Sequence, residues 1–267
     1  MANKNKIFTL EISEKISNFY KIKISDTNGN STFIAFAPIS KNLVFFNNDK
    51  LTFFFIRHEY QLRKMLHNKK PETYYPGFKV NFVIKNNKQV EAFNDLTKIV
   101  VLDRREGNYN IYTKKYGKKN IIELYTDGCY YKEKRRGGYA AIIKNLNGKL
   151  SIVWGQTLKP MSSTLLELMA VIKGLQSLNN ISQLRINTDS RYVIKGLTEW
   201  IENWKLNQWF TIQGKKVKNI EFWKLYDKLT EGKYIEFKWI KAHSQHFENT
   251  ISDYYAKLAA FYNKKTY

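Results

Sequence analysis

The stretch LYTDGCYYKEKRRGGYAAII, residues 124–143, carries an acid where an apolar run ends. Residues 121–125 are apolar enough to predict a buried strand, and Asp127 stands two positions beyond them. A carboxylate at such a place is costly, because burial disfavours its charged form. A functional role for Asp127 is therefore one hypothesis, and a plain turn residue before Gly128 is the other.

Strands and helices alternate outward from this stretch. The hydrophobic pattern predicts strands over 121–128, 137–145 and 149–158, then a helix over about 163–178, a strand over 183–189, helical segments over 190–204 and 222–230, a strand over 234–240 and a closing helix over 249–265. Ser162 or Ser163 can cap the first helix. The order βββαβαααβα indicates an α/β fold in which antiparallel strands lead into parallel ones.

The N-terminal half has a different character. Strand-like runs at 19–25 and 31–37 flank a turn at 26–30, and the runs LVFF, LTFFFI and FKVNFVI continue this pattern. Only residues 57–67 predict a helix here. Residues 103–120 are polar and basic, which is typical of a linker. We therefore expect a smaller β-rich or α+β accessory domain over 1–102, a linker over 103–120 and an α/β domain over 121–267.

Composition limits the classes of molecule that the chain is expected to bind. The formal net charge of the 267 residues is +22, which favours a polyanion such as nucleic acid. An A+T-rich coding sequence would also give many lysines, so charge alone does not decide this. Cys129 is the only cysteine, which excludes an intramolecular disulfide and a cysteine-based zinc site. No apolar run is long enough for a membrane span, and the first residues lack the apolar core of a signal peptide, so we expect a cytoplasmic protein.

Four acids fall where such a fold presents side chains to a cleft: Asp127 and Asp189 at strand ends, Glu167 among the apolar residues of a helix, and Asp253 near the start of the last helix. Each has an ordinary alternative as a turn residue, a helix-surface charge, an N-cap or a first-turn acid. Together they would make an all-oxygen site of high negative charge, suited to Mg²⁺ or Mn²⁺.

The chain resembles the type 1 ribonuclease H family over about residues 121–262. The stretches that carry the resemblance are YTDGCY with GGYAAII, LLELMAVIKGL, NTDSRYVIKGLTEWIENW, KKVKNIEFW and WIKAHSQHFENTISDYYAKLA, in the family's order. The resemblance implies a mixed five-stranded sheet with flanking helices. It also implies an endonuclease that hydrolyses the RNA strand of RNA·DNA hybrids, with Asp127, Glu167, Asp189 and Asp253 holding two Mg²⁺ or Mn²⁺ ions.

The resemblance implies further site residues. His243 matches the family's histidine, which can move protons or help release product; a solvated loop histidine is the alternative. The implied substrate-binding residues are Gly128, Cys129, Ser190, Trp200, Trp204, Lys205, Lys215, Lys216, Lys218 and Asn249. Ordinary core packing is the alternative for the tryptophans. The products would carry a 5′-phosphate and a 3′-hydroxyl.

The sequence departs from the family at two places. Residues 132–136 are charged where the family has a Gly/Pro-rich turn, and residues 162–165 carry hydroxyls where it is rich in asparagine. Two other functions remain as alternatives, a related nuclease that acts on DNA and a non-catalytic nucleic-acid-binding module. The N-terminal half has no such resemblance, and an affinity-raising or a structural role fits it equally.

Overall fold

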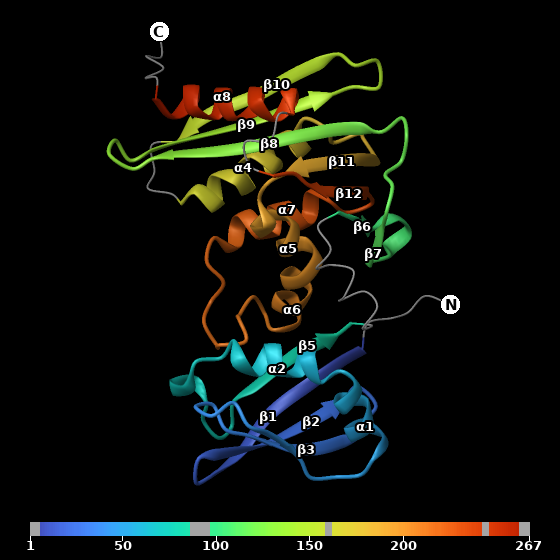
Figure 1. Ribbon diagram of the computed structural model, residues 1–267, viewed down its shortest axis with the longest axis vertical. Coiled ribbons are helices and arrows are strands. Elements are labelled where there is room, and N and C mark those ends of the chain that lie inside the picture. The colour runs from blue at the N-terminus through green and yellow to red at the C-terminus, as the bar shows by residue number, and fades with distance from the viewer. Residues whose placement is uncertain (1–5, 86–96, 158–161, 242–245, 262–267) are drawn as a thin grey trace. The chain divides into compact units, whose positions relative to one another are not determined.

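The computed structural model describes residues 6–85, 97–157, 162–241 and 246–261 (Figure 1). The chain forms two compact units. One unit contains residues 1–90 together with 202–218, and the other contains 91–201 together with 219–267. None of the helices in the described ranges has the length and apolar character that a membrane crossing requires.

The N-terminal unit is built on an antiparallel sheet of strand order β4-β3-β2-β1-β5. Its elements are β1 (Lys6–Ile16), β2 (Phe19–Asp26), β3 (Ser31–Phe36), β4 (Leu43–Phe45), α1 (Lys50–Arg57), α2 (Glu59–His67), η1 (Pro71–Thr73) and β5 (Lys79–Ile84). Alternate residues of the strands, such as Phe8, Leu10 and Ile12, form one buried core with Phe55 and Leu62 of the helices. The predicted β-rich character is thus confirmed, in its α+β form.

Helix α1 replaces a predicted strand. The run LTFFFI has a high β propensity, which misled the local interpretation. Asp49 starts the helix instead, because its carboxylate accepts a hydrogen bond from the backbone N–H of Thr52 at 2.7 Å. The helical turn then places Phe55 in the core, with no exposed surface.

The segment 202–218 belongs to the N-terminal unit. It meets the outer edge of β5, where Asn207 accepts a hydrogen bond from the N–H of Asn81 at 2.7 Å and donates one to its carbonyl at 2.7 Å. Asn203 accepts from the N–H of Val83 at 3.0 Å. These side chains satisfy edge groups that would otherwise be left to solvent or to another chain. The predicted assignment of 202–218 to the C-terminal domain therefore differs from the observed division.

The second unit contains a seven-stranded sheet of order β10-β9-β8-β11-β12-β6-β7. Its strands are β6 (Ile99–Asp103), β7 (Asn110–Lys114), β8 (Ile122–Tyr131), β9 (Arg136–Lys144), β10 (Leu150–Thr157), β11 (Gln183–Thr188) and β12 (Tyr234–Trp239). Its helical elements are η2 (Arg105–Gly107), α4 (Ser163–Gln176), α5 (Arg191–Lys195), a π-helical turn (Gly196–Trp200), α7 (Ile220–Leu229) and α8 (Phe247–Phe261), with α6 (Ile201–Leu206) crossing the unit boundary. From β8 onward the predicted order βββαβαααβα and the five-stranded mixed sheet are confirmed.

Two predictions are wrong here. Strand β7 lies inside the predicted linker over 103–120, and most of β6 lies inside the predicted domain over 1–102. Strand β6 pairs antiparallel with β12 and β7 pairs with β6, so both strands extend the sheet of the second unit. The run IVVLD is short and stands beside polar residues, so its pairing partner is not visible locally. Burial of Val101 and Leu102 against the sheet is what fixes it.

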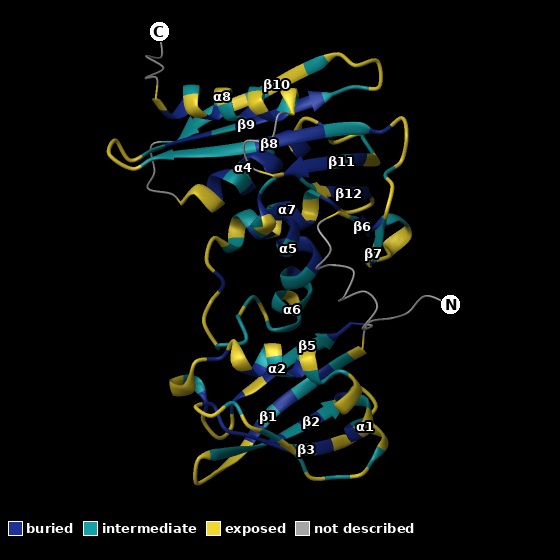
Figure 2. Cartoon of the chain, viewed as in Figure 1, coloured by how far each residue is buried: buried dark blue, intermediate teal, exposed yellow. Residues whose placement is uncertain are grey.

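Two glycines let helices approach both faces of the sheet. A Cβ on Gly137 would lie 2.6 Å from the side chain of Leu166 on α4, and one on Gly138 would lie 2.0 Å from the carbonyl oxygen of Ala256 on α8. Adjacent strand residues point to opposite faces, so α4 and α8 cover opposite sides of β9. The central strands β8 and β11 each contain a continuous run of three buried residues, 124–126 and 186–188 (Figure 2).

Candidate active site

Asp127 lies within β8, on the face that α8 covers. Its carboxylate accepts a hydrogen bond from the N–H of Gly128 at 2.7 Å. A Cβ on Gly128 would lie 2.4 Å from the backbone nitrogen of Glu167, so β8 passes against the backbone of α4 at this point. Only glycine permits this approach, which brings the strand that carries Asp127 up to the helix turn that carries Glu167.

Glu167 is half-buried on α4, and Ser190 holds it. The Ser190 hydroxyl donates a hydrogen bond to the Glu167 carboxylate at 2.5 Å. Ser190 is itself 4% exposed and caps α5, where its oxygen accepts from the N–H of Val193. The serine that the resemblance places near substrate therefore orients a carboxylate. Helix α4 begins as expected, because the Ser162 hydroxyl accepts from the N–H of Leu165.

Asp189 and Asp253 approach the same place from other elements. Asp189 follows the last residue of β11, and its carbonyl accepts a hydrogen bond from the indole N–H of Trp239 at 3.0 Å. Asp253 lies on α8, where the Lys257 ammonium contacts its carboxylate at 2.7 Å. Lys257 is a site residue that the sequence reasoning missed, although its spacing of four from Asp253 on one helix was a readable signal.

Asp127 interacts electrostatically with Asp189 and Asp253, and Glu167 interacts with Asp189. Burial, followed by the negative charges of Asp189 and Asp253, raises the pKa of Asp127 to about 7. A hydrogen bond also joins the carboxyl groups of Asp127 and Asp253. Burial raises the pKa of Glu167 as well, with a further contribution from Asp189, against the lowering effect of the Ser190 hydrogen bond. Like charges in a partly buried site cost free energy that a cation can offset.

The donor set fits a hard divalent cation. All four side chains offer carboxylate oxygens, which are the ligands that Mg²⁺ and Mn²⁺ take. Within the described ranges no three His, Cys, Asp or Glu side chains are already placed to share a metal ion. The fit therefore rests on donor type, on charge and on the proximity that raises the pKa of Asp127.

The other predicted residues lie in different settings. His243 falls outside the described residues. Cys129 is half-buried beside Asp127, and burial raises the pKa of its thiol. Asn249 is 5% exposed near the start of α8, and its side-chain oxygen has no hydrogen-bond partner among the described residues. That orphaned acceptor is available to a donor that the structure does not contain.

The tryptophans divide between the two units. Trp200 packs edge-on against Tyr192 and Trp223 in the second unit, as the core alternative predicted. Trp204 lies in the N-terminal unit, with its ring 6.5 Å from that of Trp209. The four lysines of the same segment are exposed: Lys205, Lys215, Lys216 and Lys218.

Known proteins resemble the second unit. The family model described as RNase H matches residues 119–261. A ribonuclease H of Tolumonas auensis is 40% identical over 139 residues, which are 52% of this chain and 89% of that protein. A ribonuclease H of Vibrio campbellii is 35% identical over 139 residues, with the same two shares. Among solved structures, LC9-RNase H1, a type 1 RNase H with the type 2 active-site motif, is 21% identical with a TM-score of 0.46, covering 54% of this chain and 74% of that one.

These matches coincide with the part of the chain that carries the four acids. The family model spans more than half of the chain, and the two bacterial relatives are matched over most of their own length. The chain belongs to the RNase H family.

Proposed function

We propose that this ribonuclease H is a metal-dependent endonuclease that hydrolyses the RNA strand of RNA·DNA hybrids and leaves 5′-phosphate and 3′-hydroxyl ends. The observation that carries the proposal is the approach of Asp189 and Asp253 to Asp127, whose pKa they help to raise. Four carboxylates near one another need cations, and an all-oxygen site selects Mg²⁺ or Mn²⁺. Two ions per site is our expectation.

The carboxylates have distinct supports. Asp127 and Asp189 would bind metal from adjacent strands, and Asp253 would bind from α8. Glu167 would complete the set from α4, with Ser190 fixing its rotamer. When bound, the cations supply Lewis-acid stabilisation of the charge that develops on the phosphodiester oxygens. His243 would move a proton at the leaving or attacking oxygen, as the family's histidine does.

Substrate contacts are the less constrained part of the proposal. The backbone at Gly128 and Cys129 and the amide of Asn249 would meet the RNA strand, where the 2′-hydroxyl separates RNA from DNA. The exposed lysines of residues 205–218, with Trp204, would meet the phosphates of the DNA strand. Trp200 would act indirectly, because its ring packs against Tyr192 and Trp223 in the second unit. The N-terminal unit would serve as an accessory domain, and we place the enzyme in the cytoplasm.

The decisive experiment compares substrates. We expect the full chain to cut a labelled RNA·DNA hybrid when Mg²⁺ is present and to leave duplex DNA and duplex RNA intact. Asp127→Asn should abolish the cutting. Glu231→Gln is the matched control, because that side chain is 61% exposed in the same unit and outside the carboxylate group.

Each outcome decides something. Cutting of duplex DNA in preference to hybrid would favour the alternative of a DNA nuclease. Hybrid binding by the parent chain without any cutting would favour the binding module. Equal cutting by Asp127→Asn and the parent would refute the assigned carboxylate site.

A further inference from the structure

The connection between β7 and β8, residues 115–121, is folded onto the face of the added strands. Ile121 forms a small buried cluster with Ile99 and Val101 of β6 and with Tyr234 of β12. A connection of this length would ordinarily run over the surface without a core of its own. Here apolar contacts fix its C-terminal end.

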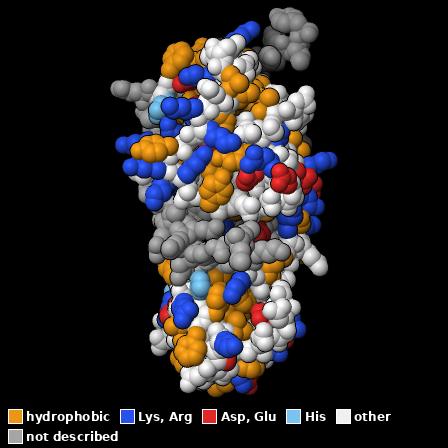
Figure 3. Space-filling model, turned by 90° about the vertical axis from the view of Figure 1, so that its right-hand side faces the viewer, with side chains coloured by type: hydrophobic (Ala, Val, Ile, Leu, Met, Phe, Trp, Pro, Cys, Tyr) orange, Lys and Arg blue, Asp and Glu red, His pale blue; other side chains and the backbone are white. Residues whose placement is uncertain are grey.

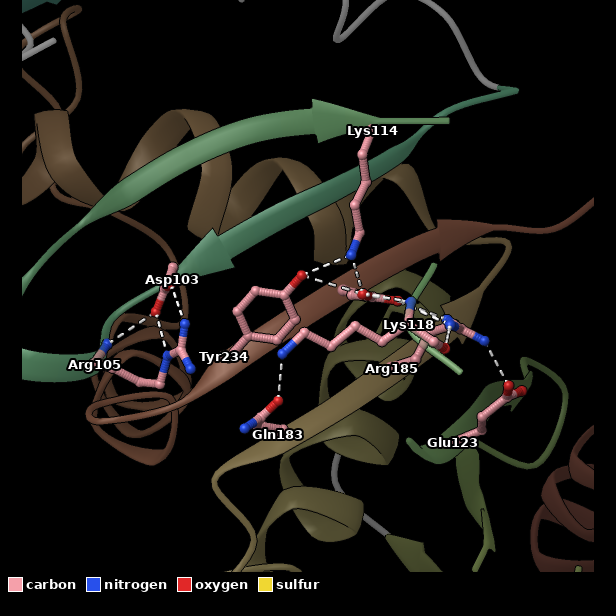
Figure 4. A network of polar contacts seen from close by, with 9 residues as sticks. Asp103, Arg105, Lys114, Lys118, Glu123, Gln183, Arg185 and Tyr234 are labelled. Carbon is pink, nitrogen blue, oxygen red and sulfur yellow. Dashed lines mark hydrogen bonds and ion pairs between the residues drawn. The ribbon is translucent and has the colours of Figure 1, made fainter. Parts of the chain in front are cut away.

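A buried carboxylate fixes the middle of the same connection. Glu236 of β12 has no exposed surface, and its carboxylate accepts from the N–H of Lys118 at 3.0 Å and contacts the ammonium of Lys114 at 2.5 Å. The guanidinium of Arg185 lies 2.9 Å away and reaches Glu123 at 2.6 Å on its other side (Figure 4). These hydrogen bonds hold the pKa of Glu236 below its ordinary value, although burial by itself raises it.

Gly117 is required by this arrangement. A Cβ there would lie 2.1 Å from a nitrogen of Arg185 and 2.7 Å from an oxygen of Glu236. The connection therefore rests directly on the ion-pair network. Four features set its position: the small apolar core, the buried Glu236 of β12, the bound guanidinium of Arg185 on β11, and Gly117 itself.

The connection and its surroundings present positive charge to solvent. A pocket of about 830 Å³ lies over it, lined by residues of 97–99, the connection itself, the β9–β10 hairpin and the end of β12. Its basic lining residues are Lys98, Lys115, Lys118, Lys119, Lys144, Arg185 and Lys238, against the single acid Glu123. The space-filling view shows Lys and Arg side chains gathered on this face of the second unit (Figure 3).

Three of these lysines form no ion pair with a described residue, so their charge is not neutralised by a neighbouring acid. Lys144 is paired with Glu248, and Arg185 with Glu123 and Glu236. Lys115, Lys119 and Lys238 are exposed, and none of them forms an ion pair with any residue in the described ranges. Lys115 and Lys119 lie on the connection and Lys238 lies on β12, and like charges gathered around one pocket cost free energy unless an anion offsets them.

The pocket shares a sheet face with the catalytic carboxylates. Glu123 and Asp127 are four residues apart on β8, and alternate residues of a strand face the same side, so their backbones are about 13 Å apart on that side. Arg185 of β11 and Asp189, which follows the last residue of β11, are also four residues apart in sequence. Trp239, which lines the pocket, donates its indole hydrogen bond to the carbonyl of Asp189.

We propose that this pocket binds the phosphodiester backbone of the nucleic acid outside the nucleotides that occupy the catalytic carboxylates. The inference rests on the proposed function, because it takes the same RNA·DNA hybrid as its ligand. Several cations spread over an open pocket suit a chain of phosphates better than a single anion.

The test measures binding of hybrid to the full chain carrying Asp127→Asn, which prevents cutting, over a range of salt concentrations. The probe is a fluorescent RNA·DNA hybrid of about 20 base pairs, roughly two helical turns. The variant replaces Lys115, Lys119 and Lys238 by glutamine, which removes charge and keeps the anchors Lys114, Arg185 and Glu236. Each lost phosphate contact should lower the slope of log affinity against log salt by about 1, so we expect a decrease of about 2 to 3 and weaker binding.

A second triple variant distinguishes binding at the pocket from a general effect of the protein's net charge. Replacing Lys173, Lys224 and Lys228 by glutamine removes the same charge from α4 and from α7, which packs against α4. We expect this control to keep the parent's salt slope.

The outcomes distinguish this inference from the proposed function. Equal salt slopes for the pocket variant and the parent on the hybrid would overturn the pocket alone. Equal losses in the two triple variants would show only a long-range effect of net charge, which also overturns it. Failure of the parent chain to bind or cut any hybrid would instead refute the proposed function.

Discussion

Glu236→Gln is the sharpest test of the network beneath the β7–β8 connection. The substitution keeps the size of the side chain and removes its charge. Arg185 retains Glu123 as an anionic partner, whereas Lys114 loses the carboxylate it contacts at 2.5 Å and keeps only the hydroxyl of Tyr234 at 2.7 Å. The main loss is therefore a partly buried ammonium left beside a neutral amide.

The magnitude follows from burial. Breaking a buried ion pair by removing one partner costs about 3 to 5 kcal/mol. The Lys114 side chain is 25% exposed, so water offsets part of the loss, and we expect unfolding free energy to fall by about 3 kcal/mol at pH 7. The exposed control Glu231→Gln, 3.8 Å from Arg104, should cost less than about 0.5 kcal/mol.

The pH dependence has a definite sign. The pKa of Glu236 is lower in the folded chain than its ordinary value near 4.5, so its ionised form stabilises the fold. That contribution is complete above the unfolded pKa and is lost as pH falls through the folded pKa. The difference between the parent and Glu236→Gln should thus be constant near neutrality and shrink below about pH 4.5.

Urea unfolding followed by circular dichroism and tryptophan fluorescence measures both quantities. Parent, variant and control are compared at neutral pH and at several acidic values. A loss below about 1 kcal/mol at pH 7 would refute the reasoning, because it would make the network a surface feature. A parent–variant difference that stays constant on acidification would refute the assignment of the effect to the Glu236 charge.

Three further substitutions test other parts of the chain. Gly138→Ala places a methyl group 2.0 Å from the carbonyl oxygen of Ala256, so we expect α8 to shift. The free energy of unfolding in urea should fall by about 1 to 3 kcal/mol, and hybrid cutting should be lost. Unchanged values of both would contradict the packing. Asn207→Ala removes both hydrogen bonds to the backbone of Asn81, and an unfolding cost of about 1 to 2 kcal/mol is expected, with faster amide exchange at β5 as the specific readout. Asp127→Asn removes one crowded negative charge, so without Mg²⁺ the variant should unfold at a higher temperature than the parent. Added Mg²⁺ should raise the unfolding temperature of the variant less than that of the parent. A lower unfolding temperature for the variant without Mg²⁺, or a larger rise with Mg²⁺, would argue against the metal site.

Local signals were sufficient for much of the second unit. The period of apolar residues predicted the order of strands and helices from β8 onward, because each element buries one face and the pattern repeats at its own period. The cap of α4 at Ser162 followed from hydroxyl chemistry at a helix start. The acids at Asp127 and Asp189 were recognisable because a charge soon after an apolar run needs a reason, although Asp127 lies within β8 and not at the predicted strand end.

Pairing over long distances in sequence was not visible in this way. Strand β6 is a short run of five residues, and its partner β12 lies more than a hundred residues later, so residues 99–102 were predicted to belong to the N-terminal domain. The segment around Phe55 shows the same limit, because its aromatic residues favour a strand. The cap at Asp49 and the burial of Phe55 in the core stabilise a helix there instead. Tertiary burial overrides local preference in both cases.

The sequence by itself determined which groups could do chemistry: four carboxylates in a fixed order, at positions where burial makes their charge costly. Only the tertiary structure decided how these carboxylates and the β7–β8 connection are held, because the side chains that position them come from distant parts of the sequence. Ser190 reaches Glu167, Gly128 lets β8 touch α4, and Glu236 fixes a loop that follows another strand. Hydrogen bonds and close approaches act over a few ångströms, and folding alone brings such residues within that range.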